Sequence, residues 1–254
     1  MAELVKLSNT KHQTLCVRPE CNIELAATQQ IMKLRVTELS KAVTNFPIFF
    51  TKDQNHGGWV LSALTSFELG QNLFVDDGIW QGTYQPNSML THPLYLMKSD
   101  EGQHSYAIGI LEGSPAFSKE QGESLFDANG NASSYLNRVT KLLETEVRGD
   151  IQTSQFSQKL VELGLLKAID LQILYQDDSA QTLAGLHTID EDKLQSLSSE
   201  QLAELSSLGY LIPAHAMLIS IYQLNFLFRK NNECKSCNTV KNVKIEVAKD
   251  RVAS

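Results

Sequence analysis

Hydrophobic positions in the first half of the chain form short runs separated by turn-forming residues, which is the pattern of β-strands. These runs predict strands at 48–50, 59–64, 73–75 and 106–111, and a short helix over 37–43. We therefore expect the N-terminal half to be rich in β-sheet.

Apolar residues in the second half recur every three or four positions, as they do on one face of a helix. This spacing predicts a helix that begins at Ser133 and ends at Gly149, and a second helix that ends at Gly164. A β-hairpin is expected over 169–189, and residues 198–201 have the spacing of a capping box, which marks a helix start. The expected fold class is α+β, with a sheet-rich N-terminal half, a helix-rich C-terminal half and a short basic tail.

The most apolar stretch, 211–228, is interrupted by Pro213, His215, Gln223 and Asn225. A helix that crosses a bilayer needs about 20 predominantly apolar residues. We therefore predict a buried helix here and no integral membrane segment. The first residues have no basic start followed by an apolar core, so we expect no signal peptide and a cytoplasmic protein.

The composition suits a folded domain, because 42% of the 254 residues are hydrophobic and 20% are charged. The 22 basic and 29 acidic residues give a net charge of −7, which argues against a nucleic-acid partner. From Arg229 onward, however, seven basic residues face three acidic ones. We expect a single domain over 1–230, with a sub-boundary near 115–133. The basic tail at 231–254 folds back, contacts an acidic partner or, as we favour, is mobile.

The four cysteines are Cys16, Cys21, Cys234 and Cys237. In a reducing cytoplasm we expect free thiols rather than a disulfide. The alternative is a four-cysteine zinc site that joins the two ends of the chain, because the last pair has the two-residue spacing of a zinc knuckle.

Motifs of the common enzyme classes are missing from the sequence. There is no phosphate loop, dinucleotide fingerprint, serine-nucleophile elbow or helical histidine pair, so no cofactor or metal is implied. The segment that begins at Asp127 resembles a calcium loop, but its twelfth position is Arg138, which favours an Asx-turn. His187 and His215 are interpreted as core histidines.

One polar and aromatic stretch, 68–86, is the best candidate for a binding surface. A pocket for a ligand or a peptide needs aromatic side chains beside a few polar groups. The candidate binding residues are Asn72, Phe74, Asp76, Trp80 and Tyr84. The structural alternative is a β-hairpin with core-facing Phe74 and Trp80 and a turn at Asp77-Gly78.

Several motifs occur in the order typical of one bacterial family. They are Phe46-Pro47-Ile48-Phe49-Phe50, Asn72-Leu73-Phe74-Val75-Asp76 with Trp80, Leu125-Phe126-Asp127 with Gly130, Leu183 to Glu191, and Leu205 to Ser220. The chain resembles the SapC family over about residues 30–230. It departs from the pattern at Leu90-Thr91-His92-Pro93-Leu94, where the family carries basic residues and an aromatic residue around the proline. If those residues grip an anionic ligand or partner, the function is altered in this chain.

The resemblance implies a link to the bacterial cell envelope, because members occur beside genes for surface-layer proteins, outer-membrane receptors and halogenase-like or hydroxylase-like proteins. It supplies no catalytic residues. We expect a cytoplasmic accessory protein that binds a polypeptide or a modifying enzyme connected with the envelope. A structural surface-layer subunit is less favoured without a secretion signal, and the oligomeric state is left open.

The alternative hypothesis is an enzyme, with or without a metal, that acts on a small molecule or a peptide. It would use carboxylates and imidazoles that the fold brings together. The candidate groups are Asp76, Asp77, His187, Asp190 and His215.

Overall fold

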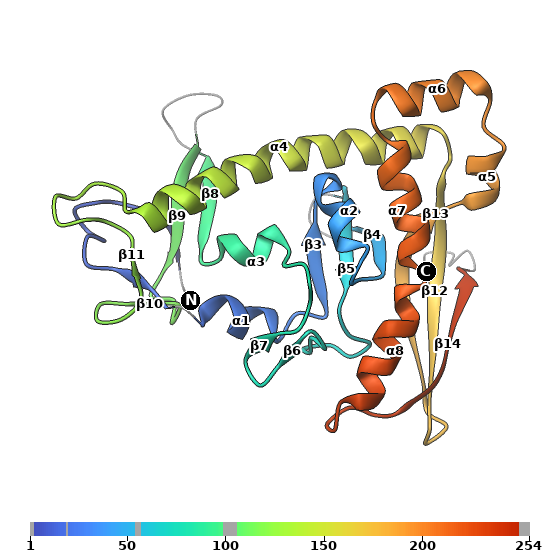
Figure 1. Cartoon of the computed structure of the whole chain (residues 1–254), viewed down its shortest axis with the longest axis horizontal. Coiled ribbons are helices and arrows are strands. Elements are labelled where there is room, and N and C mark those ends of the chain that lie inside the picture. The colour runs from blue at the N-terminus through green and yellow to red at the C-terminus, as the bar shows by residue number, and fades with distance from the viewer. Residues whose placement is uncertain (1–2, 19, 54–56, 99–105, 249–254) are drawn as a thin grey trace.

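The computed structural model describes residues 3–18, 20–53, 57–98 and 106–248. Within these residues the fold is α+β. Strands dominate the N-terminal half and helices the C-terminal half, as predicted. Figure 1 shows a large sheet at one end of the molecule, smaller sheets at the other, and one long helix that spans both.

The large sheet has six antiparallel strands in the order β14-β12-β13-β4-β5-β3. Its strands are β3 (Ile31–Leu34), β4 (Ile48–Lys52), β5 (Trp59–Leu64), β12 (Leu166–Tyr175), β13 (Ala180–Ile189) and β14 (Val240–Val247). The predicted strands at 48–50 and 59–64 and the hairpin over 169–189 are confirmed. Their apolar side chains are buried because each strand presents them to the helices on the sheet.

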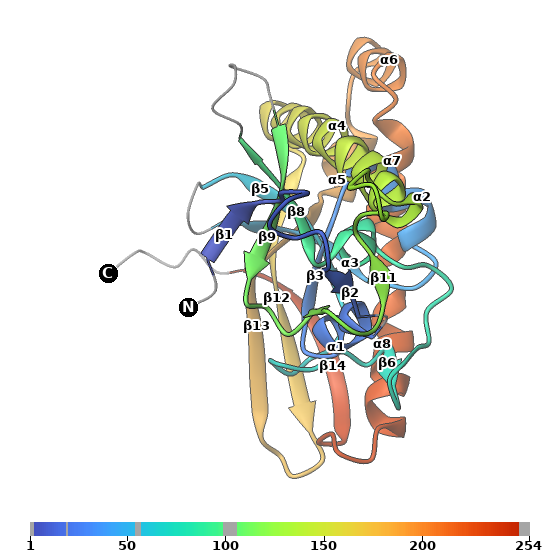
Figure 2. The same ribbon diagram turned by 90° about the vertical axis from the view of Figure 1, so that its left-hand side faces the viewer.

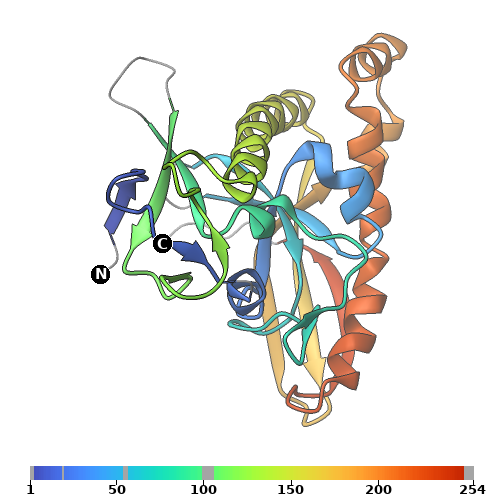
Figure 3. The same cartoon turned by 60° about the vertical axis from the view of Figure 1, so that its left-hand side comes forward.

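Helices α7 (Leu211–Ser220) and α8 (Gln223–Glu233) follow each other nearly in line along one face of this sheet (Figure 3). They bury Met217, Leu224 and Leu227 in the main core. Among the described residues, the stretch Leu211–Glu233 is the one helical segment long and apolar enough to cross a membrane, by length and composition alone. Of its most apolar window 39% is buried; Ile212, Ile219 and Tyr222 are exposed, and the other large apolar side chains of the two helices pack on the core.

The smaller sheets surround a second core. They pair β1 (Glu3–Lys6) and β8 (Leu94–Lys98) with β9 (Tyr106–Glu112), and β10 (Phe117–Ser118) and β11 (Glu123–Ser124) with β2 (Cys16–Val17). Figure 2 looks along the molecule from this end. The remaining elements are α1 (Cys21–Ala26), a 3-10 turn η1 (Val36–Glu38), α2 (Leu39–Ala42), β6 (Val75–Asp76), β7 (Ile79–Trp80), α3 (Asn87–Thr91), α5 (Glu191–Gln195) and α6 (Ser199–Ser207).

Helix α4 (Ser134–Glu162) connects the two cores. Its first turns bury Leu136, Val139 and Leu143 in the smaller core, and its last turns bury Phe156 in the larger one. The prediction of two helices was wrong, because α4 continues through Gly149 and is a single helix of 29 residues. That length corresponds to about 44 Å at 1.5 Å per residue.

Gly149 serves close packing rather than helix termination. A Cβ at this position would lie 2.8 Å from Cδ of Arg35 and 3.3 Å from its Cβ and Cγ. The missing side chain therefore lets the arginine stem lie directly against the helix backbone.

Local signals in the sequence are confirmed at three further places. Ser198 and Gln201 form the reciprocal capping box of α6. Asp127 accepts backbone hydrogen bonds from Asn129 and Asn131, as expected of an Asx-turn, and these bonds lower the pKa of its carboxyl group. The third is the β6–β7 hairpin, whose turn at Asp77 and Gly78 has positive φ at both residues, 46° and 71°.

The predicted basic tail is part of the fold as far as residue 248. Helix α8 extends to Glu233, and β14 pairs with β12 along its whole length. Val243, Ile245 and Val247 alternate with polar residues, which is a strand pattern despite the basic composition. The rest of the predicted tail, 249–254, lies outside the described residues.

The cysteines differ from the prediction of four free thiols. Cys234 and Cys237 form a disulfide in the connection between α8 and β14, where the turn brings them together. Cys16 and Cys21 are free and lie with the smaller sheets and their core. The structure therefore does not assemble the four cysteines into one site.

Candidate binding groove

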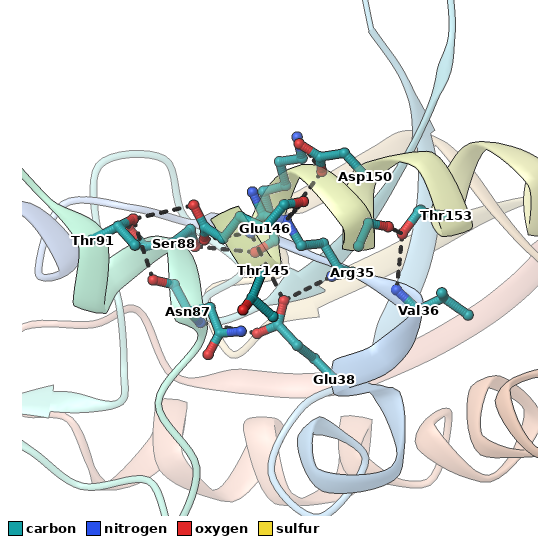
Figure 4. A network of polar contacts seen from close by, with 12 residues as sticks. Arg35, Val36, Glu38, Asn87, Ser88, Thr91, Thr145, Glu146, Asp150 and Thr153 are labelled. Atoms are coloured by element: carbon teal, nitrogen blue, oxygen red, sulfur yellow. Dashed lines mark hydrogen bonds and ion pairs between the residues drawn. The ribbon is translucent and has the colours of Figure 1, made fainter. Parts of the chain in front are cut away.

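The largest group of buried charges lies on α4 between the two cores, and Arg35 is at its centre (Figure 4). Arg35 follows β3, and its side chain is 6% exposed. Nη1 donates to Oε1 of Glu146 at 2.6 Å, and Nε donates both to the backbone carbonyl of Glu146 and to Oδ1 of Asp150, each at 3.1 Å. Arg35 thus ties β3 to the middle of α4.

Glu38 holds the other side of this network. Its Oε2 accepts the backbone N–H of Arg35 at 2.9 Å. Its Oε1 accepts the hydroxyl of Tyr84 at 2.7 Å and the backbone N–H of Asn87 at 2.9 Å. Burial, followed by the neighbouring Glu38 carboxylate, raises the pKa of Tyr84, so this hydroxyl remains a donor. The start of helix α3 is thereby fixed against η1.

Glu146 is buried among groups of both signs. Burial raises the pKa of its carboxyl group, Arg35 opposes that shift, and Glu38 and Asp150 add to it. Oε1 carries the short ion pair to Arg35, whereas the bond from Thr91 to Oε2 is long, at 3.4 Å. Oε2 is therefore the less strongly bound of the two carboxylate oxygens.

An open groove of about 530 Å³ lies directly against this network. Its lining combines charged and polar groups with apolar ones: Leu25, Gln29, Lys33, Arg35, Ser88, Thr91, His92, Leu94, Tyr95, Leu96, Leu143, Glu146, Val147 and Asp150. A second hollow of about 300 Å³ shares Leu25 and His92 and extends to Cys21 and Pro115. The two hollows therefore adjoin each other, and α1, α3, β8 and α4 contribute to their lining.

The lining of the groove carries charges of both signs. Lys33 and Arg35 both bind Oδ1 of Asp150, at 2.9 and 3.1 Å. Glu146 adds a second carboxylate to the lining, whereas Glu38 is buried behind Arg35 and does not line the groove. Burial lowers the pKa of His92, so at neutral pH its imidazole adds no positive charge. Two carboxylates and two cations therefore line the groove, and Oε2 of Glu146 is the acceptor that has no strong partner.

Two of the predicted binding residues are structural. Asn72 is buried, where its amide donates to the carbonyl of Ala26 and its Oδ1 accepts the backbone N–H of Phe74. Phe74 is fully buried, with its ring 4.6 Å from that of Phe46 and 6.0 Å from that of Trp80. Neither side chain is accessible to a partner, because the hairpin directs them into the core.

The other three predicted residues are partly accessible but do not face one site. Asp76 is exposed at the hairpin tip. Trp80 is half-buried, and its Nε1 donates to the carbonyl of Tyr84. Tyr84 alone joins the network beside the groove, through Glu38. The predicted surface is therefore a hairpin and a core cluster, with one residue that supports the charged network.

The candidate catalytic groups occupy separate environments. His187 lies on β13 with its ring 4.6 Å from that of Trp59, and burial lowers its pKa. His215 was expected in the core but is exposed, with Nδ1 2.7 Å from the carbonyl of Leu211. Asp190 caps α5. Asp76 and Asp77 lie in the hairpin, and no cluster of metal-binding side chains occurs in the part of the chain that the structure describes.

The groove residues were missed because Arg35 and Glu146 are 111 positions apart in the chain. One signal was present in the sequence. Glu146 continues the helical spacing of Val139 and Leu143, so a charged residue falls on the buried face of α4. A charge at such a position requires a buried partner.

Comparison with protein-family models gives one match, to SapC, over residues 7–227. The chain belongs to the SapC family. The match includes the whole charged network, the groove and the β6–β7 hairpin, and it ends within α8. Comparison with curated proteins gives no match, and neither does comparison with solved structures.

Proposed function

We propose that this SapC-family chain is a cytoplasmic accessory protein that binds a polypeptide, either free or as part of a modifying enzyme, connected with the bacterial cell envelope. The observation that carries the proposal is the groove beside the Arg35–Glu146 network, together with the adjoining hollow that shares Leu25 and His92. Two adjoining hollows lined by elements from different parts of the chain suit an extended segment better than a single small molecule.

The lining indicates what kind of segment fits. Leu25, Leu94 and Leu143 offer apolar contacts, whereas Glu146 and Asp150 stand one helical turn apart on the same face of α4. Arg35 already lies between these carboxylates, so a lysine or arginine side chain of the partner would instead bind Oε2 of Glu146, which Arg35 leaves without a strong partner. An added cation would also offset part of the cost of burying the Glu146 carboxylate.

Affinity purification from the native host tests this proposal. Asp150→Asn removes one acceptor at the half-exposed edge of the groove, and Glu144→Gln is the matched control on the exposed face of α4. We expect one polypeptide to be retained by the wild type and by Glu144→Gln, and to be reduced about tenfold or more with Asp150→Asn, as the loss of a charged contact implies. Equal retention by all three proteins contradicts the proposal.

The enzyme hypothesis has no comparable support. Its five candidate residues lie in separate places, on the β6–β7 hairpin, β13, the cap of α5 and the exposed side of α7. Catalytic turnover of a small molecule or a peptide by the purified protein, with no polypeptide bound in the groove, would support the enzyme hypothesis.

A further inference from the structure

Strand β14 forms one edge of the six-stranded sheet. It pairs with β12 on one side, and within the described residues no strand pairs with its other side. Ile245 and Val247 on this strand are 43% and 64% exposed. An apolar edge strand with free backbone groups is a template for pairing with another strand, and natural proteins usually protect such edges.

The side chains of β14 divide into two rows. Val243 and Ile245 face a groove of about 300 Å³ beside α8, whose lining includes Tyr222 and Phe228. Tyr222 is 75% exposed. Val247 continues the same row, because side chains alternate along a strand. Lys244 and Glu246 form the charged row on the opposite face.

A second copy of β14 can pair with this edge only in certain registers. Two identical antiparallel strands are related by a two-fold axis. Two residues that lie opposite each other must both direct their N–H and C=O groups toward the other strand, or both away from it. The axis therefore passes through a residue that pairs with itself. Only a few residues of the strand can lie on this axis. The charges that each choice brings together separate Ile245 from Lys244 and Glu246.

The register centred on Ile245 is self-complementary. It places Lys244 opposite Glu246 twice, once on each side of the axis, and it places Val243 opposite Val247. Centring the axis on Lys244 or on Glu246 would bring two like charges directly together, which is destabilising. Centring it on Val243 would place Lys241 opposite Ile245.

We propose that the protein forms a symmetric dimer through antiparallel pairing of β14 about Ile245, which joins the two six-stranded sheets into one continuous sheet. The same pairing brings the apolar groove of each copy, with Tyr222 at its rim, beside that of the other. This interface is independent of the Arg35–Glu146 groove, and β14 lies beyond the residues that match SapC.

Charge exchange on β14 tests the dimer and its register together. Sedimentation equilibrium of the full chain should give twice the chain mass of 28.3 kDa. Lys244→Glu and Glu246→Lys each place like charges together and should raise the dissociation constant about tenfold or more. The double variant K244E/E246K restores opposite charges and should dimerise like the wild type. An equal mixture of the two single variants should form mixed dimers.

Lys235→Glu is the matched control, because it makes the same charge change on an exposed side chain outside β14. It should leave the dimer intact. A wild type that is monomeric at all concentrations up to about 100 µM, a range that covers weak specific pairing, overturns the proposal. A double variant no better than its single variants overturns the register.

A cysteine at the axis gives a second readout that does not depend on charge. Residues paired across antiparallel strands have Cα atoms about 4.5–5.5 Å apart, within disulfide range. Ile245→Cys should therefore yield a covalent dimer on mild oxidation, whereas Lys244→Cys and the wild type should not. Equal cross-linking of Ile245→Cys and Lys244→Cys contradicts pairing about Ile245.

Discussion

Arg35 joins the end of β3 to the middle of α4, between the two cores. A buried guanidinium is tolerated because Glu146, Asp150 and a backbone carbonyl accept its hydrogen bonds. Removing one partner of such a group leaves the others buried without compensation. The free energy of unfolding then falls by more than the intact ion pair contributes to it.

Arg35→Met should therefore lower the free energy of unfolding by about 3–5 kcal/mol, because Glu146 and Glu38 remain buried without their cation. Arg148→Met, on the exposed face of the same helix, should change it by less than about 0.5 kcal/mol. Urea unfolding of both variants measures the difference. Similar values for the two would show that Arg35 is not a structural centre.

Glu146 gives stability a defined pH dependence. Its pKa in the folded protein is raised above the ordinary glutamate value of about 4.3, so the folded state binds the proton more tightly than the unfolded state. The contribution to stability is then fully present below that ordinary value. It is lost as the pH rises through the higher folded pKa.

Glu146→Gln removes this titration. The free energy of unfolding of the wild type, minus that of the variant, should fall as the pH rises from about 4 and become constant above the folded pKa. Denaturant titrations at half-unit pH steps measure the curve. A difference that rises with pH would mean that Arg35, rather than burial, dominates the pKa of Glu146.

At the level of elements, local signals in the sequence predicted those features that are determined by residues close together in the chain. The capping box of α6, the hairpin turn at Asp77-Gly78 and the β12–β13 hairpin each depend on residues close in sequence. The division of α4 into two helices was wrong for a non-local reason. Gly149 has the composition of a helix end, but its role depends on Arg35, more than a hundred positions away.

Gly149→Ala tests this explanation of α4. Alanine favours a helix over glycine by about 1 kcal/mol. The added Cβ would lie 2.8 Å from Cδ of Arg35, whose head is held by ion pairs and cannot move away freely. We expect a net destabilisation of about 1–3 kcal/mol, as for other overpacked sites.

The control for this prediction is the same substitution in an Arg35→Ala background. There Cγ and Cδ of residue 35 are gone and only its Cβ, 3.3 Å from the new methyl group, remains, so most of the penalty should disappear, as thermal unfolding of the four proteins would measure. Stabilisation by Gly149→Ala in the wild-type background would contradict the packing role.

For the whole molecule, the sequence predicted the fold class and the strands β4, β5, β9, β12 and β13 but not the site. Alternating and helical periodicity report which side chains are buried, and this was enough for β4, β5, β9 and the hairpins. Which buried residues meet is a property of the tertiary fold. The sequence did not indicate that α4 connects two cores and places Glu146 against Arg35 from β3.

The same limit explains the predicted binding surface. Aromatic and polar residues close in sequence, such as Phe74 and Asn72, were expected to share a surface, but the β6–β7 hairpin turns them into the core. The groove instead draws on α1, β3, α3, β8 and α4, which are distant in sequence. Binding in this molecule is therefore expected between its two cores.

The most direct test of the proposed function is site-specific photo-cross-linking in the native host, with the photoreactive residue at Gln29 on the groove and, in a separate variant, at Glu144 on the outer face of α4. We predict a discrete adduct with one polypeptide from Gln29, mapped to a segment beside a lysine or arginine, that Asp150→Asn weakens. The same adduct from both positions would contradict binding in the groove. An adduct from Gln29 that Asp150→Asn leaves unchanged would contradict the recognition of a basic polypeptide there.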